Sequence, residues 1–339
     1  MRICIVTDAW QPQVNGVVRT LEATCAELRG RGHTVEVIGP NRFRSLPCPS
    51  YPEIRLALAG RHRIGAMIEG FGPDALHIAT EGPLGFAARA WAVRGGMPFT
   101  SAFHTHFPDY AAERTHLPAS VFWPLIQRFH RASQAVFCAT ETLAQDLSSR
   151  GIGPLHRWGR GVDLATFHPD GGRHPAMTRL PDPVMLYVGR VAVEKNLDAF
   201  LSLQMPGTKV VVGDGPQRAE LQRRHPDARF LGVLRGEELA SAYRAADVFV
   251  FPSLTDTFGL VMAEALACGT PVAGFDVAGP RDVLTQRVGT ISPDLREAVQ
   301  CALTLDRHAC AQYGASFSWA AATEQFLAGL AVRRTAIAA

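Results

Sequence analysis

The chain has 339 residues, 47% of them hydrophobic and 19% charged, and a formal net charge of +3 at pH 7. This length suits two domains, the composition excludes a disordered chain, and so small a net charge gives no support to nucleic-acid binding. The seven cysteines lack CxxC spacing, and no apolar run reaches the roughly 18 residues of a membrane-spanning helix, so we expect a cytoplasmic protein without zinc sites or disulfides.

The first half of the chain alternates short apolar runs with helical patterns. The predicted strands are 2–6, 34–38, 75–79, 98–103 and 135–139. The predicted helices are 17–29, 83–94, 119–132 and 141–150. Short apolar strands between helices are typical of a parallel sheet that is buried on both faces.

A stretch rich in Pro and Gly, residues 166–182, predicts a linker, after which the alternation restarts. The predicted strands of the second half are 184–188, 208–213, 228–231, 247–250, 271–274 and 288–291. Its predicted helices are 195–203, 216–224, 236–245, 258–268, 293–308 and 318–333. Two such runs in series predict an α/β protein with two Rossmann-like, doubly wound domains.

This organisation gives expected domain limits and an expected place for ligands. We expect an N-terminal domain over 1–166, a C-terminal domain over 183–315, and a last helix within 316–339 that packs back toward the N-terminal domain. Ligands of doubly wound sheets bind at the carboxyl ends of the strands. A central cleft that both domains face is therefore the expected site.

The loop after the first predicted strand contains Asn15, Gly16 and Val17 but no GxGxxG fingerprint. A glycine at a helix start allows a ligand to approach closely, and the free N–H groups there suit phosphate. Gly16 is therefore a candidate donor-binding residue. A plain loop with a glycine at the helix start explains the same residues equally well.

The segment from Phe103 to Pro108 follows a predicted strand and contains His104 and His106. Histidines at i and i+2 point the same way on a strand, which would suit a metal pair. No third ligand is identified, so we assign no metal site and no cofactor. His104 is a candidate catalytic residue, and a structural histidine that caps a strand is the alternative.

Arg190 and Lys195 lie on a loop between a strand and a helix. Only two of the 34 basic residues of this chain are lysines, Lys195 and Lys209, which makes Lys195 conspicuous. A departing nucleotide diphosphate accumulates negative charge, and fixed cations stabilise that charge without a metal. A solvated loop cation is the alternative.

The most informative segment runs from Phe251 to Val272 and reads as strand, loop, helix, glycine stop and strand. Asp256 and Glu264 are eight residues apart in it, which corresponds to about 12 Å along a helix axis. An extended nucleotide sugar has this scale, so one carboxylate would bind sugar hydroxyls and the other the ribose, with the helix N-terminus facing the diphosphate. The alternative is an N-cap aspartate and a surface glutamate.

Together these residues resemble the family-4 glycosyltransferases of the GT-B fold. That family carries an acidic residue, seven others and then Glu around a Phe-Gly pair, which here are Asp256, Glu264, Phe258 and Gly259. The first acid of the family is most often Glu, so Asp256 leaves the donor sugar open. The resemblance covers nearly the whole chain.

The resemblance implies a retaining, metal-independent enzyme that transfers a hexosyl group from a nucleotide-diphosphate sugar. It implies that His104 lies near the transferred sugar and that Asp256 binds the hydroxyls of that sugar. For the remaining donor-binding residues it implies diphosphate contacts by Gly16, Arg190 and Lys195, backbone N–H groups from Phe258, Gly259 and Leu260, and a ribose contact by Glu264.

Segments such as 77–85 and 158–163 also resemble one branch of this family, the bacterial enzymes that glycosylate membrane lipids: diacylglycerol glycosyltransferases, sulfoquinovosyl diacylglycerol synthases and phosphatidylinositol mannosyltransferases. Independently, residues 1–165 carry 17 Arg, no Lys and 13 acidic residues. Within 42–63, apolar residues alternate with five arginines against one acid, which suits an anionic bilayer. The candidate membrane and acceptor residues are Arg42, Arg44, Arg61 and Arg63.

The expected function is thus a glycolipid-forming transferase at the inner face of the cell membrane, with a UDP-sugar favoured as donor and a lipid such as diacylglycerol as acceptor. For residues 42–63 a solvated loop plus a buried strand remains open. A GDP-mannose-dependent mannosyltransferase acting on a phosphoinositide or a soluble glycan is an alternative function. A sugar-nucleotide epimerase and a non-catalytic nucleotide-sugar binding protein are alternatives from other classes.

Overall fold

The computed structural model describes residues 1–13, 15–48, 51–104, 107–108, 112, 115, 117–256 and 258–333. The chain forms two compact units. Unit 1 comprises Met1–Gly159 together with Trp319–Ala339, and unit 2 comprises Arg160–Ser318. The predicted linker, residues 166–182, therefore belongs to unit 2, where its backbone is held by side chains of that unit.

Unit 1 is built on a six-stranded parallel sheet in the order β2-β1-β5-β6-β7-β8. Its strands are β1 (Arg2–Val6), β2 (Thr34–Ile38), β5 (Ala75–Ile78), β6 (Phe99–Ala102), β7 (Val136–Cys138) and β8 (Leu155–Arg157). Its helices are α1 (Gly16–Gly30), α2 (Arg61–Phe71), α3 (Pro83–Gly95), α5 (Trp123–His130), α6 (Glu141–Ser149) and α14 (Trp319–Gly329), with short 3-10 turns η1 (Pro40–Arg42) and η2 (Ala119–Val121).

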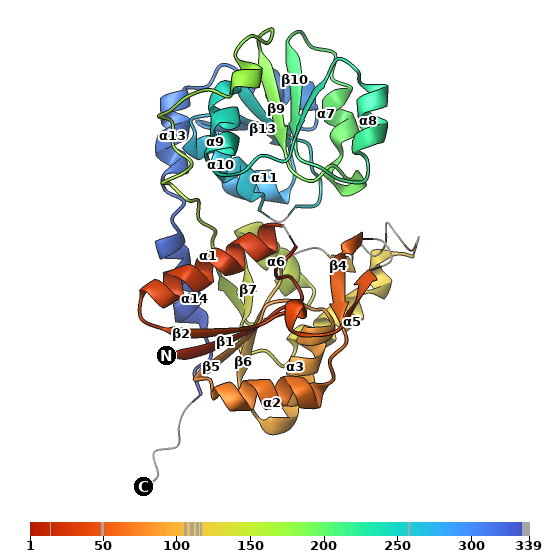
Figure 1. Cartoon of the computed structure of the whole chain (residues 1–339), viewed down its shortest axis with the longest axis vertical. Coiled ribbons are helices and arrows are strands. Elements are labelled where there is room, and N and C mark those ends of the chain that lie inside the picture. The colour runs from red at the N-terminus through yellow and green to blue at the C-terminus, as the bar shows by residue number, and fades with distance from the viewer. Residues whose placement is uncertain are drawn as a thin grey trace. The chain divides into compact units, whose positions relative to one another are not determined.

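The two faces of this sheet are separated by the alternation of side chains along each strand. Ile3 and Ile5 of β1 point into a cluster with α1 and α14, whereas Cys4 and Val6 point into a cluster with α2 and α3. Figure 1 shows α14 lying beside α1, and Phe326 of α14 is fully buried in the first cluster. The last helix is thus an integral part of the core of unit 1.

Unit 2 repeats the architecture with a different strand order, β11-β10-β9-β12-β13-β14. Its strands are β9 (Val184–Val188), β10 (Thr208–Val212), β11 (Arg229–Gly232), β12 (Val248–Phe251), β13 (Val272–Phe275) and β14 (Gly289–Ser292). Its helices are α7 (Leu197–Leu201), α8 (Arg218–Arg224), α9 (Gly236–Ala245), α10 (Leu260–Ala267), α11 (Ala278–Val283), α12 (Leu295–Ala302) and α13 (Arg307–Gly314), with 3-10 turns η3 (Pro175–Met177) and η4 (Val193–Lys195).

The strand order of each sheet defines one switch point, where the direction of strand progression reverses. In unit 1 it lies between β1 and β5, and in unit 2 it lies between β9 and β12. Ligands of open α/β sheets bind outside the carboxyl ends of the strands at this position. The loops after β1, β5, β9 and β12 are therefore the expected places for a ligand-binding site.

The prediction of two Rossmann-like parallel sheets is confirmed, and each predicted strand is present within about two residues. Four elements of unit 1 were not predicted: α2, β8 and the antiparallel hairpin of β3 (Ser45–Cys48) and β4 (Tyr51–Ala57). Pro47 and Pro52 lie in the hairpin, and proline is disfavoured in strands other than edges. In the part of the chain that the structure describes, no helix combines the length and apolarity needed to cross a membrane.

The prediction of a single helix over 293–308 was wrong, and α11 was missed. The predicted helix ends at Ala302, and α13 starts anew because the Asp306 carboxylate caps its first turn. The carboxylate accepts hydrogen bonds from the backbone N–H groups of His308 and Ala309 at 3.0 and 3.2 Å. A capping aspartate favours a helix start at this position over a continued helix.

Candidate functional site

A lysine–aspartate pair joins the two loops at the switch point of unit 2. Lys195 Nζ donates to Asp256 Oδ1 at 2.5 Å and to Oδ2 at 2.7 Å. Both side chains are about one-fifth exposed, at 21% and 20%. Sequence analysis gave these residues separate roles, whereas the structure places them in direct contact. An anionic ligand of Lys195 would therefore share this ammonium with Asp256 or take the place of one of its oxygens.

Two glycines hold the loop after β9 against the loop after β10. A Cβ atom at Gly213 would lie 1.8 Å from the carbonyl oxygen of Gly189, and one at Gly215 would lie 2.4 Å from that of Val191. Only glycine permits such backbone contact. The Tyr187 hydroxyl also donates to the carbonyl of Arg190 at 2.8 Å. The backbone that carries Arg190 is therefore fixed, and its half-buried side chain starts from a defined position.

Glu264 is buried inside α10, with only 6% of its surface exposed. Its Oε2 atom accepts a hydrogen bond of 3.0 Å from the hydroxyl of Tyr243, which is fully buried. A buried carboxylate without hydrogen-bond donors would be strongly unfavourable, so this phenol both stabilises and orients Glu264. The alternative of a surface glutamate is thereby excluded.

The expected spacing of Asp256 and Glu264 along one helix was wrong. Helix α10 begins at Leu260, with Gly259 as its N-cap in the left-handed region at φ 76°. Asp256 lies in the loop before this helix, so the rise of an α-helix does not determine its separation from Glu264. The same observation excludes Asp256 as the N-cap.

The start of α10 is shaped to leave backbone donors open. No side chain among the described residues caps its first turn. A Cβ atom at Gly259 would lie 2.8 Å from the ring of Phe251, so glycine is required both for space and for its φ angle. Phe258 is buried and packs edge-on against Phe317 with ring centroids 6.0 Å apart. The N–H groups near Gly259 and Leu260 therefore suit an anion.

Gly16 begins α1, but its helix start differs from the expectation. The side chain of Asn15 caps the helix, and its Oδ1 atom accepts from Val17 N and Val18 N at 3.0 Å each. Two of the N–H groups that we expected to face a phosphate are thus bound to Asn15. An anion at this helix start would have to use the Gly16 backbone or displace the Asn15 side chain.

His104 is the second residue after β6 and is 9% exposed. Its ring packs edge-on against the buried Trp158 with centroids 5.5 Å apart, which holds the imidazole at the carboxyl end of the sheet. His106, considered as its metal partner, lies outside the described residues. Within the described parts of the chain, no group of three or more His, Cys, Asp or Glu side chains could hold a metal ion.

Sequence analysis missed a set of polar residues at the switch point of unit 1. Asp8 follows β1, and its carboxylate accepts from Leu84 N at 2.9 Å, Gly85 N at 3.2 Å and Thr80 Oγ1 at 3.0 Å. Burial raises the pKa of Asp8, and these three donors act in the opposite direction. Asp8 thus ties the loop after β1 to the start of α3. Its position directly after a buried strand was the available signal.

The four candidate membrane arginines surround the hairpin and the first turn of α2. The Arg63 guanidinium lies 4.9 Å from the ring centre of Phe43 and donates to the carbonyl of Arg42 at 3.5 Å. Arg42 also forms an ion pair with Glu36, while Arg44 and Arg61 are exposed. Leu46 and Leu58 are each 56% exposed beside them. The structure therefore brings basic and apolar side chains together on this part of unit 1.

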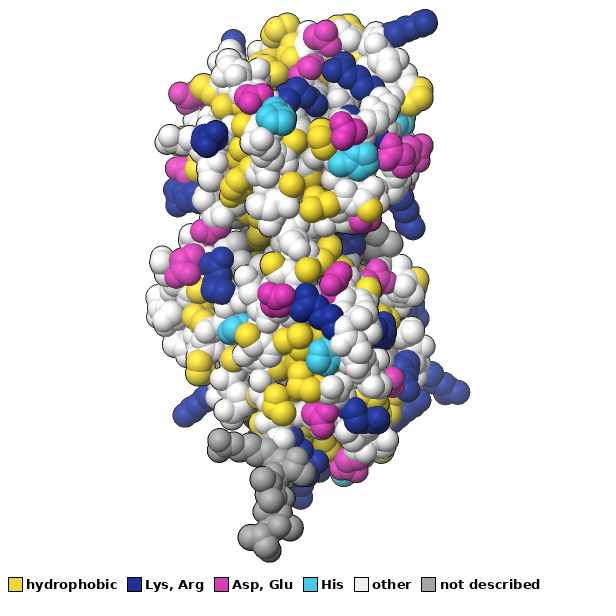
Figure 2. Space-filling view, turned by 90° about the vertical axis from the view of Figure 1, so that its left-hand side faces the viewer, with side chains coloured by type: hydrophobic (Ala, Val, Ile, Leu, Met, Phe, Trp, Pro, Cys, Tyr) yellow, Lys and Arg dark blue, Asp and Glu magenta, His cyan; other side chains and the backbone are white. Residues whose placement is uncertain are grey.

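Overall charge does not explain this grouping. On the face of the molecule in Figure 2, acidic and basic side chains are interspersed with apolar ones, in agreement with the small net charge. The basic character near residues 42–63 is thus a local property and not a consequence of the whole chain. A membrane contact of this surface would therefore depend on the side chains of residues 42–63 and not on the net charge of the chain.

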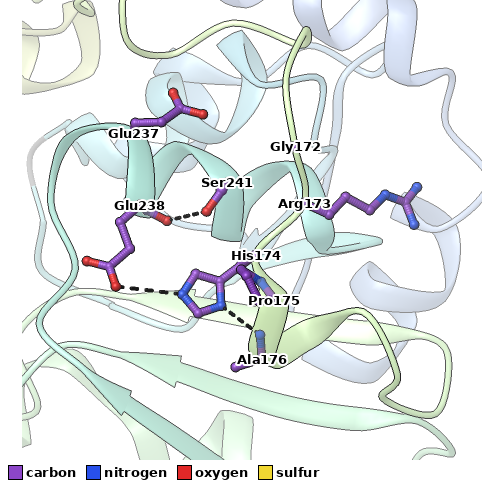
Figure 3. A pocket seen from close by; sticks show the side chains of 8 residues that line it. All are labelled: Gly172, Arg173, His174, Pro175, Ala176, Glu237, Glu238 and Ser241. Carbon is purple, nitrogen blue, oxygen red and sulfur yellow. Dashed lines mark hydrogen bonds and ion pairs between the residues drawn. The ribbon is translucent and has the colours of Figure 1, made fainter.

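A separate hollow of about 500 Å³ in unit 2 lies between residues 172–176 and α9 (Figure 3). His174 Nε2 is 3.9 Å from Glu238 Oε1, and His174 N donates to Ser241 O at 3.0 Å. Figure 3 shows the Arg173 side chain pointing away from His174. None of the predicted site residues lines this hollow. Its contacts attach residues 172–176 to α9 and contribute no catalytic group.

Comparisons with known proteins agree with the two-unit organisation. The family model described as Glycosyltransferase Family 4 matches residues 14–166, and that described as Glycosyl transferases group 1 matches residues 182–305. The chain is 34% identical to the GDP-mannose-dependent alpha-mannosyltransferase of Mycobacterium tuberculosis over 86% of this chain and 84% of that relative. It is 27% identical to the alpha-monoglucosyldiacylglycerol synthase of Streptococcus pneumoniae over 80% of this chain and 70% of the relative.

Among solved structures, sucrose-phosphate synthase from Thermosynechococcus elongatus matches with a TM-score of 0.77. The match covers 96% of this chain and 97% of that protein at 21% sequence identity. At this identity the likeness shows the shared fold alone.

Proposed function

Because the chain belongs to the family-4 glycosyltransferases, we propose that it transfers a hexosyl group from a nucleotide-diphosphate sugar to a membrane lipid, with retention of the anomeric configuration. The observation that carries the donor side of this proposal is the contact of Lys195 with Asp256 beside the start of α10, where Gly259 is the N-cap. A sugar diphosphate needs a cation, a hydroxyl acceptor and backbone donors in one place, and this switch point of unit 2 supplies all three.

Each donor residue has a role in this proposal. Arg190 and Lys195 bind the diphosphate, and Lys195 exchanges part of its contact with Asp256 for a phosphate oxygen. The freed Asp256 oxygen then accepts hydrogen bonds from the sugar. Glu264, oriented by Tyr243, accepts from the ribose hydroxyls, and the N–H groups from Phe258 to Leu260 face the diphosphate. For Gly16 and His104 of unit 1 the proposal keeps the roles that the family resemblance implies, a diphosphate contact and a position near the transferred sugar.

The proposed reaction replaces one bond at the anomeric carbon by another on the same face of the sugar. The bond to the diphosphate oxygen breaks, the acceptor oxygen forms the new glycosidic bond, and the acceptor's proton passes to the leaving phosphate. Arg190 and Lys195 balance the charge that develops on the diphosphate, which is why we propose that no metal is required. Full activity in excess EDTA is the expected result, and activity that returns only with added divalent metal would contradict it.

For the donor we propose GDP-mannose as the first candidate. The relative named above is a GDP-mannose-dependent enzyme, and its 34% identity over 86% of this chain supports this donor. The UDP-sugar favoured by sequence analysis is the second candidate. A thermal-shift series with GDP-mannose, UDP-glucose, GDP and UDP separates them, because only the nucleotide that binds raises the melting temperature.

The lipid acceptor is proposed from two observations. One relative is named as a synthase of a glucosylated diacylglycerol. Unit 1 also has a surface with exposed basic and apolar side chains, those of Arg44, Arg61, Leu46 and Leu58. Each Lys or Arg near an anionic leaflet contributes about 1 kcal/mol, so three effective contacts give roughly 3 kcal/mol. That is enough for reversible, peripheral attachment, which we propose occurs at the inner face of the cell membrane.

Vesicle co-sedimentation tests the membrane contact. Vesicles of phosphatidylglycerol with phosphatidylcholine are compared with vesicles of phosphatidylcholine alone, at low and high salt. We expect binding to the anionic vesicles that weakens as salt shortens the Debye length, and that falls when Arg42, Arg44, Arg61 and Arg63 are all changed to Ser. A matched control changes four exposed arginines of unit 2, Arg223, Arg224, Arg229 and Arg235, to Ser. Equal sedimentation of both variants would contradict the proposed surface.

Product analysis separates the remaining functions. A glycolipid formed from a labelled nucleotide sugar and diacylglycerol or phosphatidylinositol supports the proposal. Isomerisation of the donor without an acceptor would instead indicate an epimerase, and donor binding without any turnover would indicate a binding protein. A glycosylated soluble sugar would remove the lipid acceptor but leave the donor site unchanged.

A further inference from the structure

Glu81 lies at the switch point of unit 1 and has no role in the proposed donor site. It follows β5 in the short turn that leads into α3. Its side chain is 12% exposed, and its Oε1 atom is 3.2 Å from Nε2 of the fully buried His130. No residue that the structure describes donates a hydrogen bond to its other oxygen, Oε2. A carboxylate is thus held by one oxygen at the place where ligands of such sheets bind.

A hydrogen-bond chain determines which way the protons of this cluster point. Ser133 Oγ is 2.7 Å from the carbonyl of Ala135, which has no proton, so Ser133 donates to it. Ser101 Oγ, 2.9 Å from Ser133 Oγ, must therefore donate to Ser133. His130 Nδ1 lies 2.8 Å from Ser101 Oγ. Because Ser101 has already donated its only hydroxyl proton, Nδ1 is the donor in this contact. The hydroxyl protons of Ser101 and Ser133 are therefore both donated to groups within unit 1.

The last contact of the chain needs one more proton. With Nδ1 protonated, the 3.2 Å contact between His130 Nε2 and Glu81 Oε1 requires a proton on one of these two atoms. This hydrogen bond ties Glu81 Oε1 to the His130 ring. The Glu81 side chain is held in one orientation by a fully buried ring.

The backbone of the same turn is held from the other side. Asp8 N donates to Thr80 Oγ1 at 2.7 Å, and Thr80 Oγ1 donates to Asp8 Oδ2 at 3.0 Å. A Cβ atom at Gly82 would lie 2.4 Å from the Asp8 carboxyl carbon, and one at Gly85 would lie 1.9 Å from the carbonyl oxygen of Thr80. The turn from Thr80 to Gly85 is thus fixed before any ligand binds. Preorganisation of this kind is typical of a binding residue.

We propose that Glu81 binds the acceptor: its Oε2 atom accepts a hydrogen bond from a hydroxyl group of a polyol, the headgroup class that includes glycerol and inositol. His130, with Ser101 and Ser133 behind it, is the positioning residue. The inference rests on the proposed function, because it assigns the acceptor of that reaction to unit 1. A carboxylate suits this task because it offers acceptors only, and a hydroxyl is the group that the reaction consumes.

The test compares Glu81→Gln with Glu69→Gln. Glu69, in the same unit, also accepts from a ring N–H, that of Trp91 Nε1 at 3.1 Å. Glu81→Gln removes the carboxylate whichever way its carboxamide turns: either the NH2 group or a neutral amide oxygen, a weaker acceptor than a carboxylate oxygen, then faces the acceptor's position. Initial rates are measured at saturating donor with diacylglycerol or phosphatidylinositol in mixed micelles, and separately with free myo-inositol.

We expect Glu81→Gln to raise the KM for the acceptor about tenfold, the scale of one charge-assisted hydrogen bond, with an unchanged KM for the donor. His130→Gln raises the acceptor KM less, again without an effect on the donor KM. Glu69→Gln leaves both constants unchanged. The micelle and free-inositol arms show whether the hydroxyl belongs to a lipid headgroup or to a soluble polyol. An acceptor KM equal in Glu81→Gln and Glu69→Gln overturns the inference.

A binding measurement keeps the inference separate from the proposed function. Saturation-transfer NMR follows free myo-inositol and glycerol on wild type, Glu81→Gln and Glu69→Gln, with melting temperatures measured in parallel. Loss of polyol binding in Glu81→Gln alone, at an unchanged melting temperature, supports the inference even if no transfer is detected. Polyol binding that is absent from wild type, or equal in all three proteins, overturns it.

Discussion

The two switch points of this molecule have the same topology but opposite chemistry. In unit 2 the loops after β9 and β12 are joined by a cation and a carboxylate, Lys195 and Asp256. In unit 1 the carboxylate of Asp8 joins the loop after β1 to Thr80 in the loop after β5, and the carboxylate of Glu81 in that second loop contacts His130 at the end of α5. A fixed cation suits phosphate, whereas a carboxylate suits hydroxyl groups. The comparison indicates that one architecture was used twice for ligands of different charge.

The two regions also differ in how their acids are kept in place. Glu264 of unit 2 accepts a hydrogen bond from the buried hydroxyl of Tyr243, whereas Asp8 of unit 1 accepts from two backbone N–H groups and a hydroxyl. Donors at a helix start stabilise a carboxylate strongly, so Asp8 has a structural task.

The largest expected effect follows from removing the cation of unit 2. Lys195→Ala should lower turnover by about 10² to 10³, the scale of one lost electrostatic stabiliser. The substitution also leaves Asp256 without its lysine partner, so sugar binding changes along with diphosphate binding. Steady-state kinetics check this. Lys209→Ala is the matched control, because Lys209 Nζ donates to the backbone carbonyls of Leu201 and Leu203. Wild-type turnover in Lys195→Ala would remove the contrast between the two switch points.

The next effect concerns the nucleotide. Glu264→Ala should weaken nucleotide binding by about 1.5–3 kcal/mol, because the ribose loses a charged hydrogen-bond acceptor. Calorimetry with GDP and with UDP measures the affinity. Glu297→Ala in α12 serves as the control, since that carboxylate accepts from Ser292 Oγ at 2.6 Å outside the proposed site. An unchanged affinity in Glu264→Ala would sink the ribose assignment.

A smaller effect is expected from the residue behind Glu264. Tyr243→Phe removes the hydroxyl that donates to Glu264 Oε2 and leaves the buried ring in place. The loss of one hydrogen bond costs about 1 kcal/mol, so the dissociation constant of the nucleotide should rise roughly fivefold. Weaker nucleotide binding in Tyr243→Phe than in wild type, with equal melting temperatures of the two proteins, supports an orienting role over general destabilisation. A nucleotide affinity that is insensitive to the hydroxyl contradicts the positioning role.

A separate effect is expected on the acid stability of unit 1, which is measured on folding and not on activity. His77 on β5 is fully buried against Phe137, Trp158 and Phe326, and burial lowers its pKa from 6.5 to about 3. The folded protein therefore keeps this ring neutral, whereas the unfolded chain protonates it below pH 6.5. The stability that His77 contributes is fully present above pH 6.5 and is lost progressively as the pH falls toward 3.

Melting temperatures between pH 7 and pH 4 check this dependence. The difference between wild type and His77→Leu should shrink as the pH falls, because only wild type has a buried imidazole to protonate. His308→Leu, at an exposed position of unit 2, is the control and should follow wild type. A His77→Leu curve parallel to wild type across the whole range would show that this ring does not set the acid stability.

Sequence analysis succeeded where the signal is local. Apolar runs predicted the strands of both sheets, since a strand buried on both faces needs consecutive apolar residues. It failed for the hairpin at 45–57, where prolines conceal two short strands, and for the distance between Asp256 and Glu264, where a loop was taken for a helix. The capping Asn15 was visible in the sequence, but its occupation of the Val17 and Val18 donors was not.

By itself the sequence determined the family, the two runs of parallel strands and the acidic residues that follow β12, because these depend on residues close together in the chain. Only the tertiary structure decided which loops meet. Lys195 and Asp256 are 61 residues apart, and Glu81 and His130 are 49 residues apart. Their contacts follow from the order of strands in each sheet, which no local pattern encodes. A strand order is selected by the packing of the whole core, and each switch point is its consequence.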